Sequence, residues 1–151
     1  WDTREPSEPI VAAAAAGARV LLSPGSKVYL GMKYGASTVL GLEWAGHIEL
    51  RDAYEWEPAD LVPGLPADAI IGVEAAVWTE TITTPDELFT LLLPRLAAVA
   101  EVAWSPAASR DWVGFRDRIA GQAHSWDHAE LAWYRSPQVD WPAERSTGPA
   151  A

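Results

Sequence analysis

One stretch of the chain decides its fold class: Ala69-Ile70-Ile71-Gly72-Val73-Glu74-Ala75-Ala76-Val77-Trp78. This apolar run lies between Asp68 and Thr79, which is typical of a strand buried inside a parallel sheet. A helix should follow, because Thr84, Pro85 and Glu87 supply an N-cap, a proline at the first helical position and the second half of a capping box. The stretch therefore predicts a strand followed by a helix.

The segments on either side extend this pattern. Residues 5–16 form an Ala-rich helix candidate that Gly17 should end, and the apolar run 18–22 should be another buried strand. The helix that begins at Thr84 should be kinked or split at Pro94, and residues 111–125 should form a last amphipathic helix. The order of helix, strand, long loop, strand and helix indicates an α/β fold with a parallel sheet. Two strands cannot close a barrel, so a barrel would need further strands before residue 1.

Composition excludes several classes of function. The chain has 11 Lys and Arg against 21 Asp and Glu, a net charge of −10, and no basic stripe, so we expect no nucleic-acid partner. No apolar run reaches the roughly 18 residues of a bilayer span, so we expect no membrane partner and a soluble protein, secreted or cytoplasmic. The chain lacks Cys, and its His residues show no metal-ligand spacing. We therefore expect no metal and no cofactor.

The chain carries nine Trp, which either fill a core or stack on the flat faces of sugars. Four of them lie on or near predicted helices and are interpreted as core residues: Trp104, Trp112, Trp126 and Trp133. Glu74 and Glu80 share one side of the expected strand, but six extended residues separate them by roughly 20 Å. A glycosidase needs its two carboxylates about 5 to 10 Å apart. Glu74 is therefore interpreted as a buried structural acid and Glu80, at the end of the strand, as a functional residue.

Two motifs carry a resemblance to a known family. The motif G-V-E-A-A-V-W-T-E at 72–80 and the motif P-R-L-A-A-V-A-E-V-A-W-S at 94–105 resemble the last strand and helix of family 20 β-N-acetylhexosaminidases. Residues 22–24, 29–34 and 42–46 resemble the preceding strand and loop of that family in the same order, and residues 134–139 resemble the end of some bacterial members. The resemblance covers nearly the whole chain.

The resemblance implies the fold of the C-terminal portion of a (β/α)8 TIM-type barrel, incomplete in this chain. Residues 1–135 would form that part of the catalytic barrel with its terminal helix, and residues 136–151 an extended or disordered tail. Because the sequence opens on Trp1 without an initiator Met, we expect a fragment of a longer protein.

The resemblance also implies an activity for the parent protein. Family members hydrolyse terminal non-reducing N-acetylhexosamine residues by a retaining mechanism in which the 2-acetamido oxygen of the substrate is the nucleophile. An adjacent Asp-Glu pair in a His-x-Gly-Gly-Asp-Glu motif orients the acetamido group and supplies the general acid and base. This motif is absent from the 151 residues and is expected upstream, so the chain alone should be inactive.

By the same resemblance, five residues form the walls of the sugar-binding subsite. Tyr29 would donate a hydrogen bond to the acetamido oxygen, Trp1 and Trp44 would enclose the acetamido methyl group, and Trp78 would stack under the pyranose. Glu80 would bind the O4 and O6 hydroxyls. An apolar cage, a donor and an acceptor beside a flat ring are what an N-acetylhexosamine requires.

Gly31 departs from the family pattern, because close bacterial relatives have an Asp there that contacts the outer hydroxyls of the sugar. Recognition of O4 or O6 is expected to be looser. Two alternatives stay open: a non-catalytic remnant that binds amino sugars, and a structural α/β domain in which every Trp is core. The second leaves unexplained why four residues cluster at loops and strand ends: Tyr29, Trp44, Trp78 and Glu80.

Overall fold

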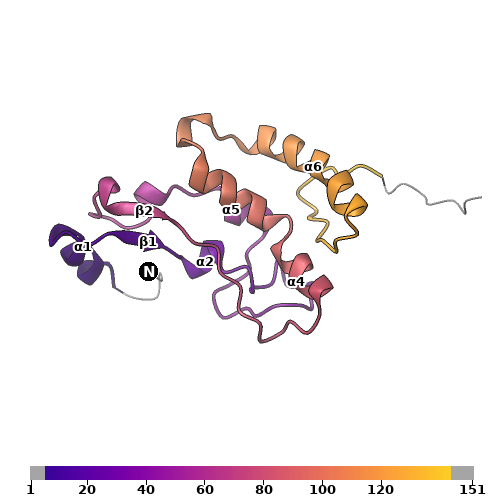
Figure 1. The fold of residues 1–151 in the computed structure, drawn as a ribbon, viewed down its shortest axis with the longest axis horizontal. Helices are drawn as coiled ribbons and strands as arrows, with labels where there is room; N and C mark the ends of the chain where they lie inside the picture. The colour runs from indigo at the N-terminus through magenta and orange to yellow at the C-terminus, as the bar shows by residue number, and fades with distance from the viewer. Residues whose placement is uncertain (1–5, 144–151) are drawn as a thin grey trace, which may run out of the picture.

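The structure is a computed structural model that describes residues 6–143. Its elements are α1 (Ser7–Ala15), β1 (Val20–Leu22), α2 (Gly25–Val28), α3 (Leu50–Tyr54), η1 (Pro58–Asp60), η2 (Ala67–Ala69), β2 (Ile70–Val73), α4 (Pro85–Leu92), α5 (Arg95–Trp104), η3 (Ala107–Ser109) and α6 (Trp112–His128). Figure 1 shows α1 and the two strands toward one end of the molecule and α6 toward the other. Within residues 6–143, no helix combines the length and the apolar character that crossing a membrane requires.

The strands β1 and β2 form a two-stranded parallel sheet, which confirms the predicted α/β class. Val20 pairs with Ile70 and Leu22 with Val73, with an irregularity near the start of β1. The strand predicted over 69–78 is shorter than expected, because regular pairing stops at Val73 and resumes only as an isolated bridge at Ala76. Both strands lead into loops at their carboxyl ends.

The helix ends follow the local signals in the sequence. Gly17 has a φ of +96° directly after α1, a conformation that a residue with a Cβ rarely adopts. At the start of α4, the hydroxyl of Thr84 accepts from the Glu87 amide at 3.2 Å, and the Glu87 carboxylate accepts from the Thr84 amide at 3.0 Å. Pro94 separates α4 from α5, and Asp111 caps α6. The predicted break at Pro94 is confirmed.

The main core lies between α3, α5, α6 and the long loop before α3. Its fully buried side chains include Val28, Leu30, Met32, Ile48, Leu50 and Ala98. Burying an aliphatic side chain of this size contributes about 1.5 to 3 kcal/mol. Three of these residues belong to the loop of residues 29–48, so this loop is anchored although it has almost no regular structure.

The Trp residues of the helices differ from one another. Trp126 is 9% exposed and packs against Trp133, with ring centroids 5.3 Å apart. Trp112 is half-buried against Tyr54, at 5.8 Å. Trp104 is 89% exposed, so its interpretation as a core residue is wrong. It is the last residue of α5, where the helix runs beyond the main core.

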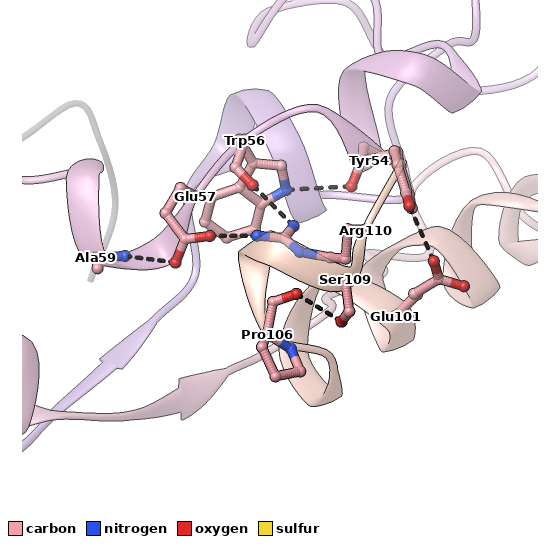
Figure 2. A network of polar contacts seen from close by, with 9 residues as sticks. Tyr54, Trp56, Glu57, Ala59, Glu101, Pro106, Ser109 and Arg110 are labelled. Carbon is pink, nitrogen blue, oxygen red and sulfur yellow. Dashed lines mark hydrogen bonds and ion pairs between the residues drawn. The ribbon is translucent and has the colours of Figure 1, made fainter. Parts of the chain in front are cut away.

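A polar network joins the end of α3 to α5 and to the residues just before α6. Figure 2 shows Tyr54 donating a hydrogen bond to Glu101 of α5 at 2.9 Å. In the same view, Arg110 donates to the main-chain carbonyl of Trp56 at 3.0 Å and forms an ion pair with Glu57. The network holds the end of α3 against α5 and the residues just before α6.

The residues after α6 fold back onto α3. Ser136 is fully buried, and its hydroxyl donates to the Glu49 carboxylate at 2.7 Å. The side-chain oxygen of Gln138 accepts from the Arg51 amide at 2.9 Å. Residues 136–143 contain neither helix nor strand, and they contact α3 through these bonds. The domain boundary at residue 135 stays a prediction, and residues 144–151 lie outside the described range.

Candidate functional site

Tyr29 lies at the end of α2, where the chain runs beside the segment that follows β2. The Leu30 amide donates to the Ala76 carbonyl at 2.7 Å, and the Ala76 amide donates to the Val28 carbonyl at 3.0 Å. These two bonds fix the backbone on both sides of Tyr29. The residue itself is only 8% exposed. In parallel α/β folds, the carboxyl ends of strands are where binding sites form.

Three aromatic rings from three separate segments meet at this point. The Tyr29 ring makes an edge contact with Trp44, with centroids 5.8 Å apart and planes at 78°. It makes a second edge contact with Trp78, at 6.0 Å and 69°. Within residues 6–143, Trp44 is 48% exposed and Trp78 is 51% exposed, so about half of each residue is not covered by the described part of the chain. The arrangement offers a tyrosine between two accessible flat rings, which suits a sugar with an apolar substituent.

Backbone pairing within the loop of residues 29–48 sets the place of Trp44. The Lys33 amide donates to the Leu42 carbonyl at 2.7 Å, and the Leu42 amide donates to the Gly31 carbonyl at 2.9 Å. Gly41 has a φ of +103°, and a Cβ there would lie 2.8 Å from the Lys33 nitrogen. Only glycine fits at position 41, because any side chain would separate the paired segments.

Gly31 lies against the main chain of Trp78. A Cβ at position 31 would be 3.2 Å from the Trp78 carbonyl oxygen and 3.3 Å from its nitrogen. A side chain here would therefore press on the segment that carries the Trp78 ring. Gly31, which departs from the family pattern, therefore lies where its main chain and that of Trp78 approach closely.

A charged group borders the Trp44 side of the cluster. The Lys33 ammonium lies 3.1 Å from the Glu43 carboxylate, and His47 lies 3.7 Å from the same carboxylate. The hydrogen bond from Lys33 is the main reason that the pKa of Glu43 lies below its usual range. Glu43 therefore carries a negative charge next to Trp44 at neutral pH.

Two acidic residues that the sequence analysis singled out are not part of the three-ring contact. Glu80 is exposed in a turn closed by the bond from the Ile82 amide to the Thr79 carbonyl, at 3.1 Å. Glu74 accepts a hydrogen bond from the Ser23 hydroxyl at 2.7 Å and is exposed among the described residues, so its burial inside a complete barrel stays a prediction. Trp1 lies outside the described residues. Among residues 6–143, no group of three His, Asp or Glu side chains is arranged to hold a metal ion.

Arg95 is a central residue of this region that the sequence analysis did not identify. It is the first residue of α5 and fully buried. Its guanidinium donates to the main-chain carbonyls of Leu30 at 2.7 Å, Met32 at 2.9 Å, Ile48 at 2.9 Å and Leu91 at 2.8 Å. Burial lowers the pKa of Arg95 from its ordinary value. The signal in the sequence was an Arg directly after Pro94, at the start of a largely apolar helical run.

Comparison with known proteins identifies the family of the chain. The sequence model described as "Glycosyl hydrolase family 20, catalytic domain" matches residues 1–107. A β-N-acetylhexosaminidase from Cellulomonas fimi is 60% identical over 151 residues, which is 100% of this chain and 30% of the relative. A β-hexosaminidase from Porphyromonas gingivalis is 34% identical over 113 residues, 72% of this chain and 14% of the relative. The chain thus spans under a third of the length of these relatives.

Solved structures agree with the sequence match. The family 20 β-N-acetylhexosaminidase from Streptomyces coelicolor A3(2) superposes with a TM-score of 0.89 at 47% identity, covering 93% of this chain and 29% of that one. A mutant Streptomyces plicatus β-hexosaminidase in complex with the product GlcNAc gives 0.88 at 46% identity, with the same coverage. Catalytic domains of this family are TIM barrels, and residues 6–143 of this chain supply two parallel strands. The chain belongs to glycosyl hydrolase family 20 and forms part of its catalytic barrel.

Proposed function

We propose that the protein to which this chain contributes is an exo-acting β-N-acetylhexosaminidase. Its substrate would be a terminal non-reducing N-acetylhexosamine of an oligosaccharide or glycoconjugate, cleaved with retention by the acetamido oxygen of the substrate itself. The observation that carries the proposal is the contact of Tyr29 with both Trp44 and Trp78. The Cellulomonas fimi relative supports the activity by its description as a β-N-acetylhexosaminidase.

Each ring of the cluster has a defined task in this proposal. The Tyr29 hydroxyl donates to the acetamido oxygen and holds it in line with the anomeric carbon. Trp44 encloses the acetamido methyl group, and Trp78 stacks under the pyranose, where a flat indole face matches the C–H face of the sugar. The half-exposed state of both indoles supports these tasks.

The remaining groups complete the subsite. Glu80 accepts hydrogen bonds from the O4 and O6 hydroxyls, a charge-assisted contact that selects the non-reducing end of the substrate. Trp1, which lies outside the described residues, would supply a further wall around the methyl group by the family resemblance. The Asp-Glu pair that orients the acetamido group and moves protons comes from a part of the protein outside these 151 residues.

The proposal is tested with two matched substrates and the full-length protein. An aryl N-acetyl-β-glucosaminide should be hydrolysed at least about 10³-fold faster than the corresponding aryl β-glucoside, because only the first carries an intramolecular nucleophile. Similar rates on the two substrates would contradict substrate assistance. Binding of N-acetylglucosamine without turnover of either substrate would favour a non-catalytic amino-sugar-binding protein instead.

A further inference from the structure

Arg95 is a buried cation whose N–H groups all end on main-chain carbonyls. A guanidinium has five N–H donors, and all five are used here. One face of the guanidinium lies 3.7 Å from the centroid of the Tyr34 ring. Taking a cation out of water is costly, and an apolar side chain of similar volume would avoid that cost. What Arg95 provides beyond packing is therefore geometry, because its hydrogen bonds fix the positions of these carbonyls.

Most of these carbonyls belong to the loop that carries Tyr29 and Trp44. The acceptors on the loop are the carbonyl oxygens of Leu30, Met32 and Ile48. Two of them follow Tyr29 closely, and the third lies just beyond Trp44 near the end of the loop. One side chain thus joins the start of the loop to its end. A bond to the Leu91 carbonyl ties both to α4.

We infer that Arg95 is a positioning residue for the sugar site, and that its guanidinium sets the separation of Tyr29 from Trp44. The inference rests on the proposed function, in which these two side chains hold the acetamido group of the substrate. Arg95 does not touch the sugar in this scheme and acts through Tyr29. Lysine cannot replace it, because a single ammonium cannot span carbonyls that a planar five-donor group reaches at once.

A double-mutant cycle in the full-length protein tests this role. Arg95→Lys should lower kcat per folded molecule by at least about tenfold when Tyr29 is present, because a misplaced donor loses alignment of the nucleophile. In a Tyr29→Phe background, the same substitution should lower kcat by less than about threefold, because the group that Arg95 positions is already gone. Equal losses in the two backgrounds would overturn the inference.

Arg110→Lys is the matched control. The Arg110 side chain is only 8% exposed and also donates to a main-chain carbonyl, that of Trp56, but it lies in the network of Figure 2 and outside the sugar loop. This variant should be less stable and keep kcat per folded molecule in both backgrounds. If it lowers kcat as Arg95→Lys does, the effect of Arg95 is one of general stability and the inference is wrong. Full activity of Tyr29→Phe alone would instead contradict the proposed role of Tyr29.

A second measurement does not depend on activity. In protein labelled with 5-fluorotryptophan, the Trp44 fluorine resonance, assigned through Trp44→Phe, should shift in Arg95→Lys and stay in place in Arg110→Lys. If Arg95→Lys is not recovered folded, Tyr34→Leu takes its place, because it removes the ring beneath the guanidinium and should shift the same resonance. An unshifted Trp44 resonance in the folded variant would overturn the inference whatever the enzyme hydrolyses.

Discussion

Replacing Tyr29 with phenylalanine removes one hydroxyl and leaves the rest of the site in place. The Tyr29 residue is 8% exposed, and its ring contacts both indoles edge-on at 5.8 and 6.0 Å. Phenylalanine keeps this burial and both edge contacts, so the packing contribution cancels between the two proteins. Any change in rate then comes from the lost hydrogen bond.

The size of the change distinguishes two explanations. If the hydroxyl holds the acetamido oxygen while that oxygen attacks, it is a preorganised donor, and removing one such donor costs about 10² to 10³ in kcat, or roughly 3 to 4 kcal/mol. If the hydroxyl only packs in the loop, losing it costs about 1 kcal/mol and acts through stability. We expect the first result, with a much smaller change in KM.

The assay is steady-state hydrolysis of an aryl N-acetyl-β-glucosaminide by the full-length protein, with rates divided by the folded fraction. Tyr54→Phe is the control, because Tyr54 also donates a hydrogen bond, to Glu101 at 2.9 Å, but belongs to the network between α3 and α5. It should lose stability and keep its kcat. A Tyr29→Phe protein within about threefold of the wild-type rate, a difference below 1 kcal/mol, would refute the reasoning.

Three further predictions concern other residues. Trp78→Ala should lower both affinity and kcat in the same assay, because the half-exposed indole supports a ring that flattens in the transition state; an unchanged kcat would exclude that contact. Glu80→Gln should raise KM and leave the acid limb of the pH–rate profile in place, whereas a shifted limb would make Glu80 a proton donor. Burial raises the pKa of Tyr34 to about 12 from 10.0, so its contribution to stability is complete below pH 10 and lost as the pH rises through 12. A shift of two pK units corresponds to a loss of about 3 kcal/mol in the free energy of unfolding. Measured by urea unfolding between pH 8 and 12, this free energy should decline less in Tyr34→Phe than in the wild type. Equal declines in the two proteins would contradict the prediction.

Local chemistry made much of the fold predictable. The ends of α1 and α4 depend on residues within one turn of each terminus, such as Gly17, Thr84 and Glu87. Pro94 splits the helical run because a proline cannot continue the hydrogen-bond ladder. The two strands stand out as apolar runs for the same local reason, although Ile71 of β2 is 56% exposed rather than buried as expected. Their lengths were less predictable, because pairing at Ala76 depends on the distant Tyr29 segment.

Contacts between distant residues account for what the sequence could not reveal. Arg95 and Leu30 are 65 positions apart, and no spacing rule connects a helical arginine to a loop carbonyl. The exposure of Trp104 depends on where α5 runs past the core, which helical periodicity does not show. Tyr29, Trp44 and Trp78 were expected in one site by family resemblance, and their rings do meet. Their roles toward a sugar stay predictions.

The bond between Ser136 and Glu49 has a consequence for synthesis of the protein. The two residues are 87 positions apart, so Glu49 leaves the ribosome long before its hydroxyl donor exists. At about 5 to 20 residues per second, translation separates them by roughly 4 to 17 s. During that interval water must solvate a carboxylate whose pKa burial later raises. The packing of residues 136–138 against the start of α3 is therefore completed late in synthesis.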